Sequence, residues 1–233
     1  MTPRLVLLPG LDGTGDLFAP FISELGSSPE TKVVRYPSDG CPDYASCEAA
    51  ARLALPRIGS YVLLGESFSG PVAIRIAASK PAGLSGLILC ASFARNPRPA
   101  LRRFRALLRR VPRRHPPNWL VSSLVLGSAS TPVLTSMLVR SLKQTAPEIL
   151  LSRALAVLDV DAARELADVK VPILYLKARR DRLVPVAAYQ EILAIARQVS
   201  VVDIDAPHFV LQVAPKEAVD SIRGFFGSLE ARP

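Results

Sequence analysis

Ser67 stands in a short pattern of small residues that suits a serine acting as a nucleophile. The segment Gly-Glu-Ser-Phe-Ser-Gly at 65–70 follows the apolar run 61–64 and leads into a helical pattern over 70–79. Small residues two positions before and two positions after a serine let the backbone turn sharply and leave the hydroxyl exposed. The usual pattern has glycine where this chain has Ser69, which is still small. The spacing therefore predicts Ser67 as a nucleophile between a strand and a helix.

A serine nucleophile needs a base, and the chain offers two histidines, His115 and His208. His115 lies among arginines and prolines, where positive surroundings disfavour its charged form and a solvated surface role fits. His208 follows the apolar run 199–204, in the sequence Asp-Ala-Pro-His-Phe at 205–209. A loop at that place reaches the carboxyl edge of a parallel sheet, where the turn with Ser67 also lies. We therefore predict His208 as the base rather than as a histidine that only makes a structural hydrogen bond.

The third member of such a triad is an acid that accepts the other ring N–H of the histidine and stabilises the imidazolium. Asp181 fits best, because it follows the apolar run 173–176 and precedes a helical pattern, which places it at the same sheet edge. Four other aspartates are rivals, with simpler roles as helix caps or solvated surface groups. They are Asp203 and Asp205, close to His208 in sequence, and Asp159 and Asp161, which precede the run 173–176.

Two backbone N–H groups must also converge on one point to hold the oxyanion that forms when a serine attacks a carbonyl. Phe68, the residue after the nucleophile, supplies the first. The second comes from the glycine-rich turn Pro-Gly-Leu-Asp-Gly-Thr-Gly at 9–15, which follows the apolar run 5–8, with Leu11 as the predicted donor. A phosphate site is the weaker interpretation, because the turn matches neither G-x-x-x-x-G-K-[ST] nor G-x-G-x-x-G.

These residues must be positioned by alternating strands and helices. Short apolar runs rich in β-branched residues predict buried strands, and segments of helical periodicity lie between them. Near-continuous apolar strands are typical of a parallel sheet covered on both faces, so we expect an α/β fold with a doubly wound, mostly parallel sheet of about six strands. The predicted strands are 5–8, 32–36, 61–64, 87–90, 173–176 and 199–204, and the predicted helices are 43–55, 70–79, 186–196 and 215–229.

One long segment interrupts this alternation. Residues 92–170 contain no good strand and are divided by prolines into several helical stretches. We interpret them as a helical cap, or lid, inserted into one core. The predicted domains are a core of 1–92 and 171–233 and a cap of 93–170.

The formal net charge of +9 is concentrated in this cap, because 93–147 contains no Asp or Glu. In one interpretation its arginines form the solvated face of a helix whose other face, with Leu101, Phe104, Leu107 and Leu108, packs over the active site. In the other, they dock an acidic partner or an anionic lipid surface by attracting its charge. Nucleic acid is not expected as the partner, because stacking aromatics are not interleaved with the arginines. The residues in question are Arg102, Arg103, Arg105, Arg109 and Arg110.

Composition points to a packed globule in a reducing compartment. Hydrophobic residues make up 49% of the chain and charged residues 21%, which argues against disorder. The cysteines Cys41, Cys47 and Cys90 are odd in number and lack the spacing of a zinc site. The first apolar run is too short for a signal peptide, and no uninterrupted apolar stretch is long enough to span a bilayer. We therefore expect a cytoplasmic protein that is not integral to a membrane.

Taken together, these motifs resemble the α/β-hydrolase fold superfamily, in particular small bacterial serine esterase-like members with Pro-Gly-Leu-Asp-Gly-Thr-Gly at the first loop. The resemblance covers nearly the whole chain, and the order Ser67, Asp181, His208 is that of the family. It implies a minimal core with an inserted helical cap and a carboxylesterase that uses these three residues through an acyl-enzyme. That chemistry acts on a small-molecule ester and requires no metal or organic cofactor.

Three alternatives remain at this point. The family includes esterases whose basic caps accept an acyl ester attached to an acidic acyl carrier protein, and the arginines of this cap fit that use. Acyl transfer is a second possibility, because one fold hosts several chemistries. A basic-cap binding module without catalysis is the third.

Overall fold

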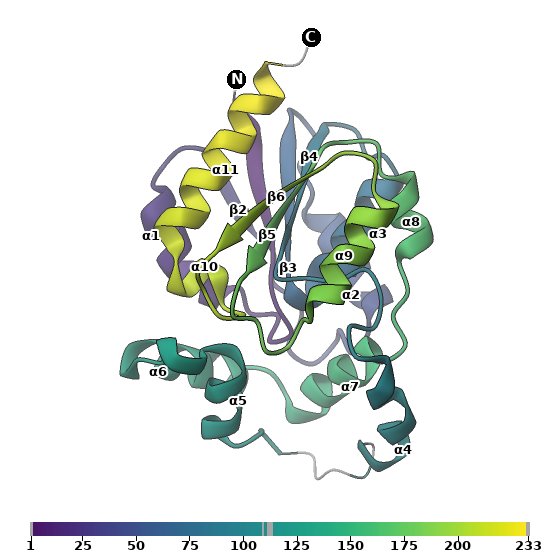
Figure 1. Ribbon diagram of the computed structural model, residues 1–233, viewed down its shortest axis with the longest axis vertical. Helices are drawn as coiled ribbons and strands as arrows, with labels where there is room; N and C mark the ends of the chain where they lie inside the picture. Colours follow the sequence, from purple (N-terminus) through teal and green to yellow (C-terminus); the bar gives the residue numbers. More distant parts are fainter. Residues whose placement is uncertain (1, 109, 111–113, 232–233) are drawn as a thin grey trace.

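A single six-stranded sheet forms the centre of the protein. The computed structural model describes residues 2–108, 110 and 114–231 (Figure 1). All neighbouring strands pair in parallel, in the order β2-β1-β3-β4-β5-β6. This confirms the predicted α/β class, and the sheet is entirely rather than mostly parallel. The strands are β1 (Arg4–Leu8), β2 (Thr31–Val33), β3 (Tyr61–Glu66), β4 (Leu84–Cys90), β5 (Ile173–Ala178) and β6 (Val199–Ile204).

The central strands are largely apolar because both faces of the sheet are covered. Every residue of β3 is buried, as are the last four residues of β1. The edge strand β2 is shorter than the predicted 32–36, because the chain turns toward the first loop after Val33. The Val34 N–H donates to Leu7 O at 2.9 Å, and the Tyr36 N–H then donates to Gly13 O at 2.8 Å. This bend brings Tyr36 under the glycine-rich turn.

Two layers of helices enclose the sheet (Figure 1). The four helices predicted from periodicity are present, with ends within one residue of the predicted ones. They are joined by short helices that the sequence pattern did not reveal. One face carries α2 (Tyr44–Ala54), α3 (Gly70–Ala78), α8 (Ala163–Asp168) and α9 (Val186–Ile195); the other carries α1 (Ala19–Leu25), α10 (Val210–Val213) and α11 (Pro215–Glu230).

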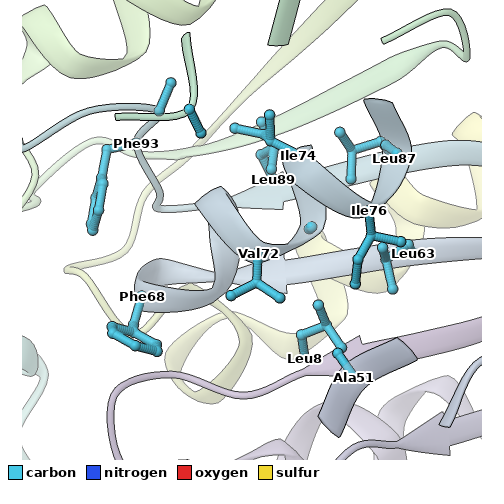
Figure 2. Close-up of a cluster of buried hydrophobic side chains, with 14 of the residues drawn as sticks. Leu8, Ala51, Leu63, Phe68, Val72, Ile74, Ile76, Leu87, Leu89 and Phe93 are labelled. Carbon is cyan, nitrogen blue, oxygen red and sulfur yellow. The ribbon is translucent and has the colours of Figure 1, made fainter. Parts of the chain in front are cut away.

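The helix that follows Ser67 is anchored deep in the core. Figure 2 shows side chains of α3, including Val72 and Ile76, gathered against the strand residues Leu63 and Leu87, all of them fully buried. Complete burial of one such aliphatic side chain stabilises a fold by about 1.5–3 kcal/mol. The turn at Ser67 is thus held between a buried strand and a buried helix.

The inserted helices lie together beyond the carboxyl ends of the strands (Figure 1). They have an apolar cluster of their own, which includes Leu126, Leu138 and Leu150. Within the predicted range 93–170, α8 differs from the rest, because it packs on the core face and buries Leu166 there. The other elements are the 3-10 turns η3 (Pro99–Phe104) and η4 (Gly127–Ala129) and the helices α4 (Arg105–Leu108), α5 (Asn118–Val125), α6 (Pro132–Lys143) and α7 (Pro147–Val157).

In the described part of the chain, no helix combines the length and the apolar character needed to cross a bilayer.

Candidate active site

Ser67 occupies a strained backbone position at the tip of the turn between β3 and α3. Its φ is 48°, in the left-handed region that side-chain-bearing residues rarely adopt. The flanking glycines make this turn possible. A Cβ on Gly65 would lie 2.7 Å from Ser69 O, and one on Gly70 would lie 1.7 Å from the Ser92 hydroxyl. Strand, turn and helix pack too closely here for any side chain at 65 or 70.

Ser69, the departure from the usual pattern, is fully buried and makes two hydrogen bonds. Its hydroxyl donates to Pro9 O, and the Tyr36 hydroxyl donates to it at 2.7 Å. A glycine would make neither bond. The serine therefore links the turn carrying Ser67 to the start of the first loop, which explains why a polar residue stands at this buried position.

A continuous hydrogen-bonded chain connects the three predicted triad residues. His208 Nε2 lies 2.8 Å from Ser67 Oγ, and His208 Nδ1 lies 2.8 Å from Asp181 Oδ2. The carboxylate can only accept, so Nδ1 carries the proton, and Nε2 is left to accept the serine proton. The side chains of His208 and Asp181 are 4% and 7% exposed, so water competes little for these bonds.

Asp181 is held in place by the loop that follows β5. Its Oδ1 accepts the N–H of Leu183 at 2.8 Å and the N–H of Val184 at 2.9 Å, which leaves Oδ2 for the histidine. The four rival aspartates have other partners. Asp203 pairs with Lys177, Asp205 with Arg180, Asp161 with Arg95, and Asp159 with Arg102 and Arg105. His115, the other histidine, lies in the cap between α4 and α5.

The predicted oxyanion donors, Leu11 and Phe68, line the same cavity as Ser67 and His208. Phe68 is the second residue of a 3-10 turn, and the first N–H groups of a helix have no acceptor within it. Its buried ring stacks on Tyr44 with 4.5 Å between ring centroids. In the first loop, the Gly13 N–H donates to Gly10 O at 3.1 Å, so the peptide that carries the Leu11 N–H belongs to a closed turn.

The first loop is also bonded to the cap, which the sequence did not reveal. The buried carboxylate of Asp12 accepts bonds from Thr14 and, at 2.7 Å, from the Ser141 hydroxyl of α6. The Thr145 hydroxyl donates to Asp12 O at 2.7 Å, and the fully buried Arg153 of α7 donates to the same carbonyl at 3.0 Å. The one available signal was a single arginine within the apolar stretch 149–157.

Glu66, next to the nucleophile, is a second buried ionisable group that sequence reasoning passed over. Its pKa is raised to about 7, first by burial and also by the nearby Asp12. A 2.9 Å hydrogen bond from the Gln212 amide lowers the pKa and so opposes them. Its signal in the sequence was an acidic residue close behind an apolar run and directly before the predicted nucleophile. Near neutral pH it titrates beside the triad without touching it.

The cavity that contains Ser67 and His208 has a volume of about 410 Å³, within the range of small-molecule sites. Its lining is mostly apolar. Arg98 lies on it, but its guanidinium donates to the main-chain carbonyls of Leu183 and Arg182, which belong to the loop carrying Asp181. The apolar lining comes from both core and cap, and includes Leu17, Phe93, Leu101, Val121, Val125, Leu138 and Leu142.

The arginines predicted as a docking surface differ in their surroundings. Arg105 contacts Asp159 at 2.8 Å and Arg102 contacts it at 3.5 Å, whereas Arg103 lies over the Phe104 ring. Arg110 is exposed. Arg109 lies outside the described residues.

The apolar side of this segment packs over the cavity only in part. Leu101 lines the cavity, but Phe104 and Leu107 are 43% and 63% exposed. The reason is local structure, because the segment forms a 3-10 turn and a four-residue helix instead of one amphipathic helix. Among the residues that the structure describes, no group of three His, Cys, Asp or Glu side chains is placed to hold a metal ion.

A parallel α/β core with a serine turn after β3, an aspartate after β5 and a histidine after β6 has the architecture of an α/β hydrolase. The chain belongs to the alpha/beta hydrolase family, whose model matches residues 5–221. It is therefore a hydrolase, as the resemblance in the sequence predicted.

Solved structures agree with this assignment at the level of fold. A hydrolase from Oleispira antarctica is 16% identical with a TM-score of 0.81, over 97% of this chain and 91% of that chain. A thermophilic esterase from Thermogutta terrifontis is 21% identical with a TM-score of 0.80, over 97% and 90%. The enol-lactonase from Burkholderia xenovorans LB400 is 20% identical with a TM-score of 0.70, over 100% and 92%. No curated protein matches the chain.

Proposed function

We propose that the protein is a serine esterase that hydrolyses carboxylic esters with Ser67 as nucleophile, His208 as base and Asp181 as the acid that orients it. The observation that carries the proposal is the pair of 2.8 Å contacts that joins these three side chains, with Ser67 and His208 on the wall of the cavity. Such a chain converts a weakly nucleophilic hydroxyl into one whose proton has an acceptor at the moment of attack.

The reaction proceeds in two halves. As Ser67 Oγ attacks the ester carbonyl, its proton passes to His208 Nε2, and the carbonyl oxygen becomes an oxyanion held by the Leu11 and Phe68 amides. The imidazolium, stabilised by Asp181, then protonates the leaving alkoxide, so that the alcohol departs and an acyl-enzyme remains. Water loses a proton to His208 as it attacks the acyl carbon. The bond from that carbon to Ser67 Oγ then breaks, the imidazolium returns the proton to Oγ, and the acid is released.

The lining of the cavity favours an uncharged acyl or alkyl group. Apolar side chains dominate the lining, and Arg98 is committed to carbonyls of the neighbouring loop. A carboxylate on the substrate would therefore be desolvated without a partner, which is costly. We expect p-nitrophenyl hexanoate to be cleaved at least about tenfold more efficiently than the p-nitrophenyl monoester of adipic acid, in which a carboxylate replaces the terminal methyl group.

The decisive experiment removes the nucleophile. Ser67→Ala should lower turnover of p-nitrophenyl hexanoate on the order of a million-fold. Ser85→Ala is the matched control, because it deletes a half-buried hydroxyl at the start of β4, where it bonds Tyr61 O, without touching the triad or the first loop. A fluorophosphonate should label the wild-type protein at Ser67 and leave Ser67→Ala unlabelled. Near-wild-type turnover by Ser67→Ala would rule out the assignment.

The cap arginines support a more specific version, in which the ester is presented by an acidic carrier protein or an anionic lipid surface. Arg103 and Arg110 have no carboxylate partner within the described residues, whereas Arg102 and Arg105 share Asp159. Exposed charges near an active-site mouth accelerate encounter with an opposite charge, and salt screens them. At low salt, turnover of the carrier-bound ester should therefore exceed that of the free ester. Equal rates at every salt concentration would exclude the docking role.

A further inference from the structure

Arg153 is a cap arginine with an environment unlike that of the exposed ones. It lies on α7, is fully buried, and in the described part of the chain its hydrogen-bond acceptors are all main-chain carbonyls. A buried guanidinium without a carboxylate partner is costly unless every donor is used, so such a residue is retained for what it holds. The carbonyls that Arg153 binds are those of Leu11, Asp12, Pro37 and Cys41.

The first two of these carbonyls belong to the loop that carries the proposed oxyanion donor. Arg153 Nη1 donates to Leu11 O and to Asp12 O, each at 3.0 Å. The loop closes around this nitrogen, because a Cβ on Gly13 would lie 2.3 Å from it. The peptide before Leu11 is thus fixed by the hydrogen bond between Gly10 and Gly13, and the Leu11 carbonyl is fixed by Arg153. Together these bonds set the direction of the Leu11 N–H.

The same guanidinium reaches the nucleophile turn through Tyr36. Its central carbon lies 5.6 Å from the centre of the Tyr36 ring, and the Tyr36 hydroxyl donates to Ser69, which donates to Pro9 O. The loop is therefore held at its start by the nucleophile turn and in its middle by α7. Both predicted oxyanion donors belong to one bonded unit.

We propose that Arg153 is the positioning residue of the oxyanion loop, so that the cap must be seated through α7 for the Leu11 amide to point at the developing oxyanion. The inference rests on the proposed esterase function and adds a role for the cap in the chemical step. Removing one oxyanion donor from a hydrolase lowers kcat by about 10²–10³-fold, so misplacing one should cost about 10–100-fold.

The first variant is Arg153→Lys, which keeps the charge but cannot reach four carbonyls with a planar fork. We expect kcat on p-nitrophenyl hexanoate to fall about 10–100-fold with KM changed less than about twofold, because the interaction is made only in the transition state. The inhibition constant of a trifluoromethyl ketone, which forms a tetrahedral oxyanion on serine, should rise by the same factor as kcat falls. Arg140→Met, an exposed arginine of the adjacent cap helix α6, is the matched control and should change neither.

A milder variant covers the case in which Arg153→Lys does not fold. Thr145→Val removes one hydrogen bond to Asp12 O without changing side-chain volume much. Its kcat should fall about threefold to tenfold, again with a parallel rise in the trifluoromethyl ketone constant. Unchanged kcat and inhibition constant in Thr145→Val and in any folded Arg153→Lys, with only a lower Tm, would show a purely structural role and overturn the inference.

Fluorophosphonate labelling separates this inference from the proposed function. If the wild-type protein is labelled at Ser67 and Arg153→Lys or Thr145→Val is labelled more slowly, both stand. If wild-type and folded variants are labelled at equal rates, the inference fails and the esterase assignment stands. If the wild-type protein is not labelled at all, the esterase assignment fails, and the role of Arg153 falls with it.

Discussion

The two halves of the cap use similar residues for different purposes. The inner half, α6 and α7, directs polar side chains into the first loop, and each of them is buried and hydrogen bonded. The outer half, η3, α4 and α5, leaves several arginines and apolar side chains in solvent, with Trp119 74% exposed, although Leu101 and Val125 line the cavity. Buried polar side chains are mostly hydrogen bonded, and those of the inner half hold the first loop, whereas exposed ones are available to other molecules.

The triad lies wholly in the core, and both halves of the cap only adjoin it. The largest effect on activity should therefore come from a substitution in the core. In Asp181→Asn, the side-chain oxygen can still accept from Leu183 and Val184, and the NH₂ group then faces His208 Nδ1. That arrangement makes Nδ1 an acceptor and places the proton on Nε2, which can no longer take the serine proton. We expect kcat to fall on the order of 10⁴-fold in steady-state assays.

Asp205→Asn is the matched control for this substitution. It changes the rival aspartate nearest to His208, which pairs with Arg180 at the surface. Its kcat should stay within about twofold, because surface ion pairs contribute little. A loss in Asp205→Asn as large as that in Asp181→Asn would mean that the proposed acid is misassigned.

The inner half of the cap contacts the first loop at Gly13, so a substitution there tests that contact. Gly13 has a φ of 75°, and a Cβ there would meet Arg153 at 2.3 Å, so Gly13→Ala should lower the free energy of unfolding by about 3 kcal/mol. Gly59→Ala is the control, because Gly59 also has a positive φ, of 85°, with nothing within 4 Å of an added Cβ, and should cost only about 1–2 kcal/mol. Urea unfolding of the two variants separates the clash from the backbone strain. Equal losses would mean that the inner cap does not press on the loop.

Part of the candidate site can be predicted from the sequence, and part cannot. That Ser67, His208 and Asp181 lie together was predictable because each follows an apolar run, and in a parallel sheet the ends of such runs meet at one edge. Arg153 was not, because its role depends on α7 packing against a loop about 140 residues earlier in the chain. The arginines of η3 and α4 were recognised from composition, but not that Arg102 and Arg105 share Asp159, since the pairing requires the cap to fold back.

A smaller effect, on the free energy of unfolding, is expected from Glu66, which lies between the core and the first loop. Its pKa in the folded protein is about 7, compared with an ordinary value of 4.5, so between these pH values the folded protein holds a proton that the unfolded chain releases. Stability should therefore decrease as pH rises from about 4.5 through 7. Glu66→Gln mimics the protonated form and should be more stable than the wild type by about 1–3 kcal/mol at pH 8, with little difference at pH 4.5.

Thermal and urea unfolding across this pH range measures the Glu66 effect. Glu30→Gln serves as the control, because Glu30 is exposed and paired with Arg4 at the surface, and its effect should not change in this window. A Glu66→Gln variant whose advantage does not grow with pH would mean that the carboxyl stays ionised in the folded protein.

The smallest effect on stability should come from the outer half of the cap. It tests directly the difference between the two halves of the cap. Leu107 of α4 is 63% exposed and Leu138 of α6 is 2% exposed, so the same deletion can be made in each half. Leu107→Ala should change the free energy of unfolding by less than about 0.5 kcal/mol, whereas Leu138→Ala should lower it by about 2–4 kcal/mol, because it leaves a cavity. A loss above about 1.5 kcal/mol in Leu107→Ala would mean that the outer half is packed in solution, and its arginines would then be structural rather than available for docking.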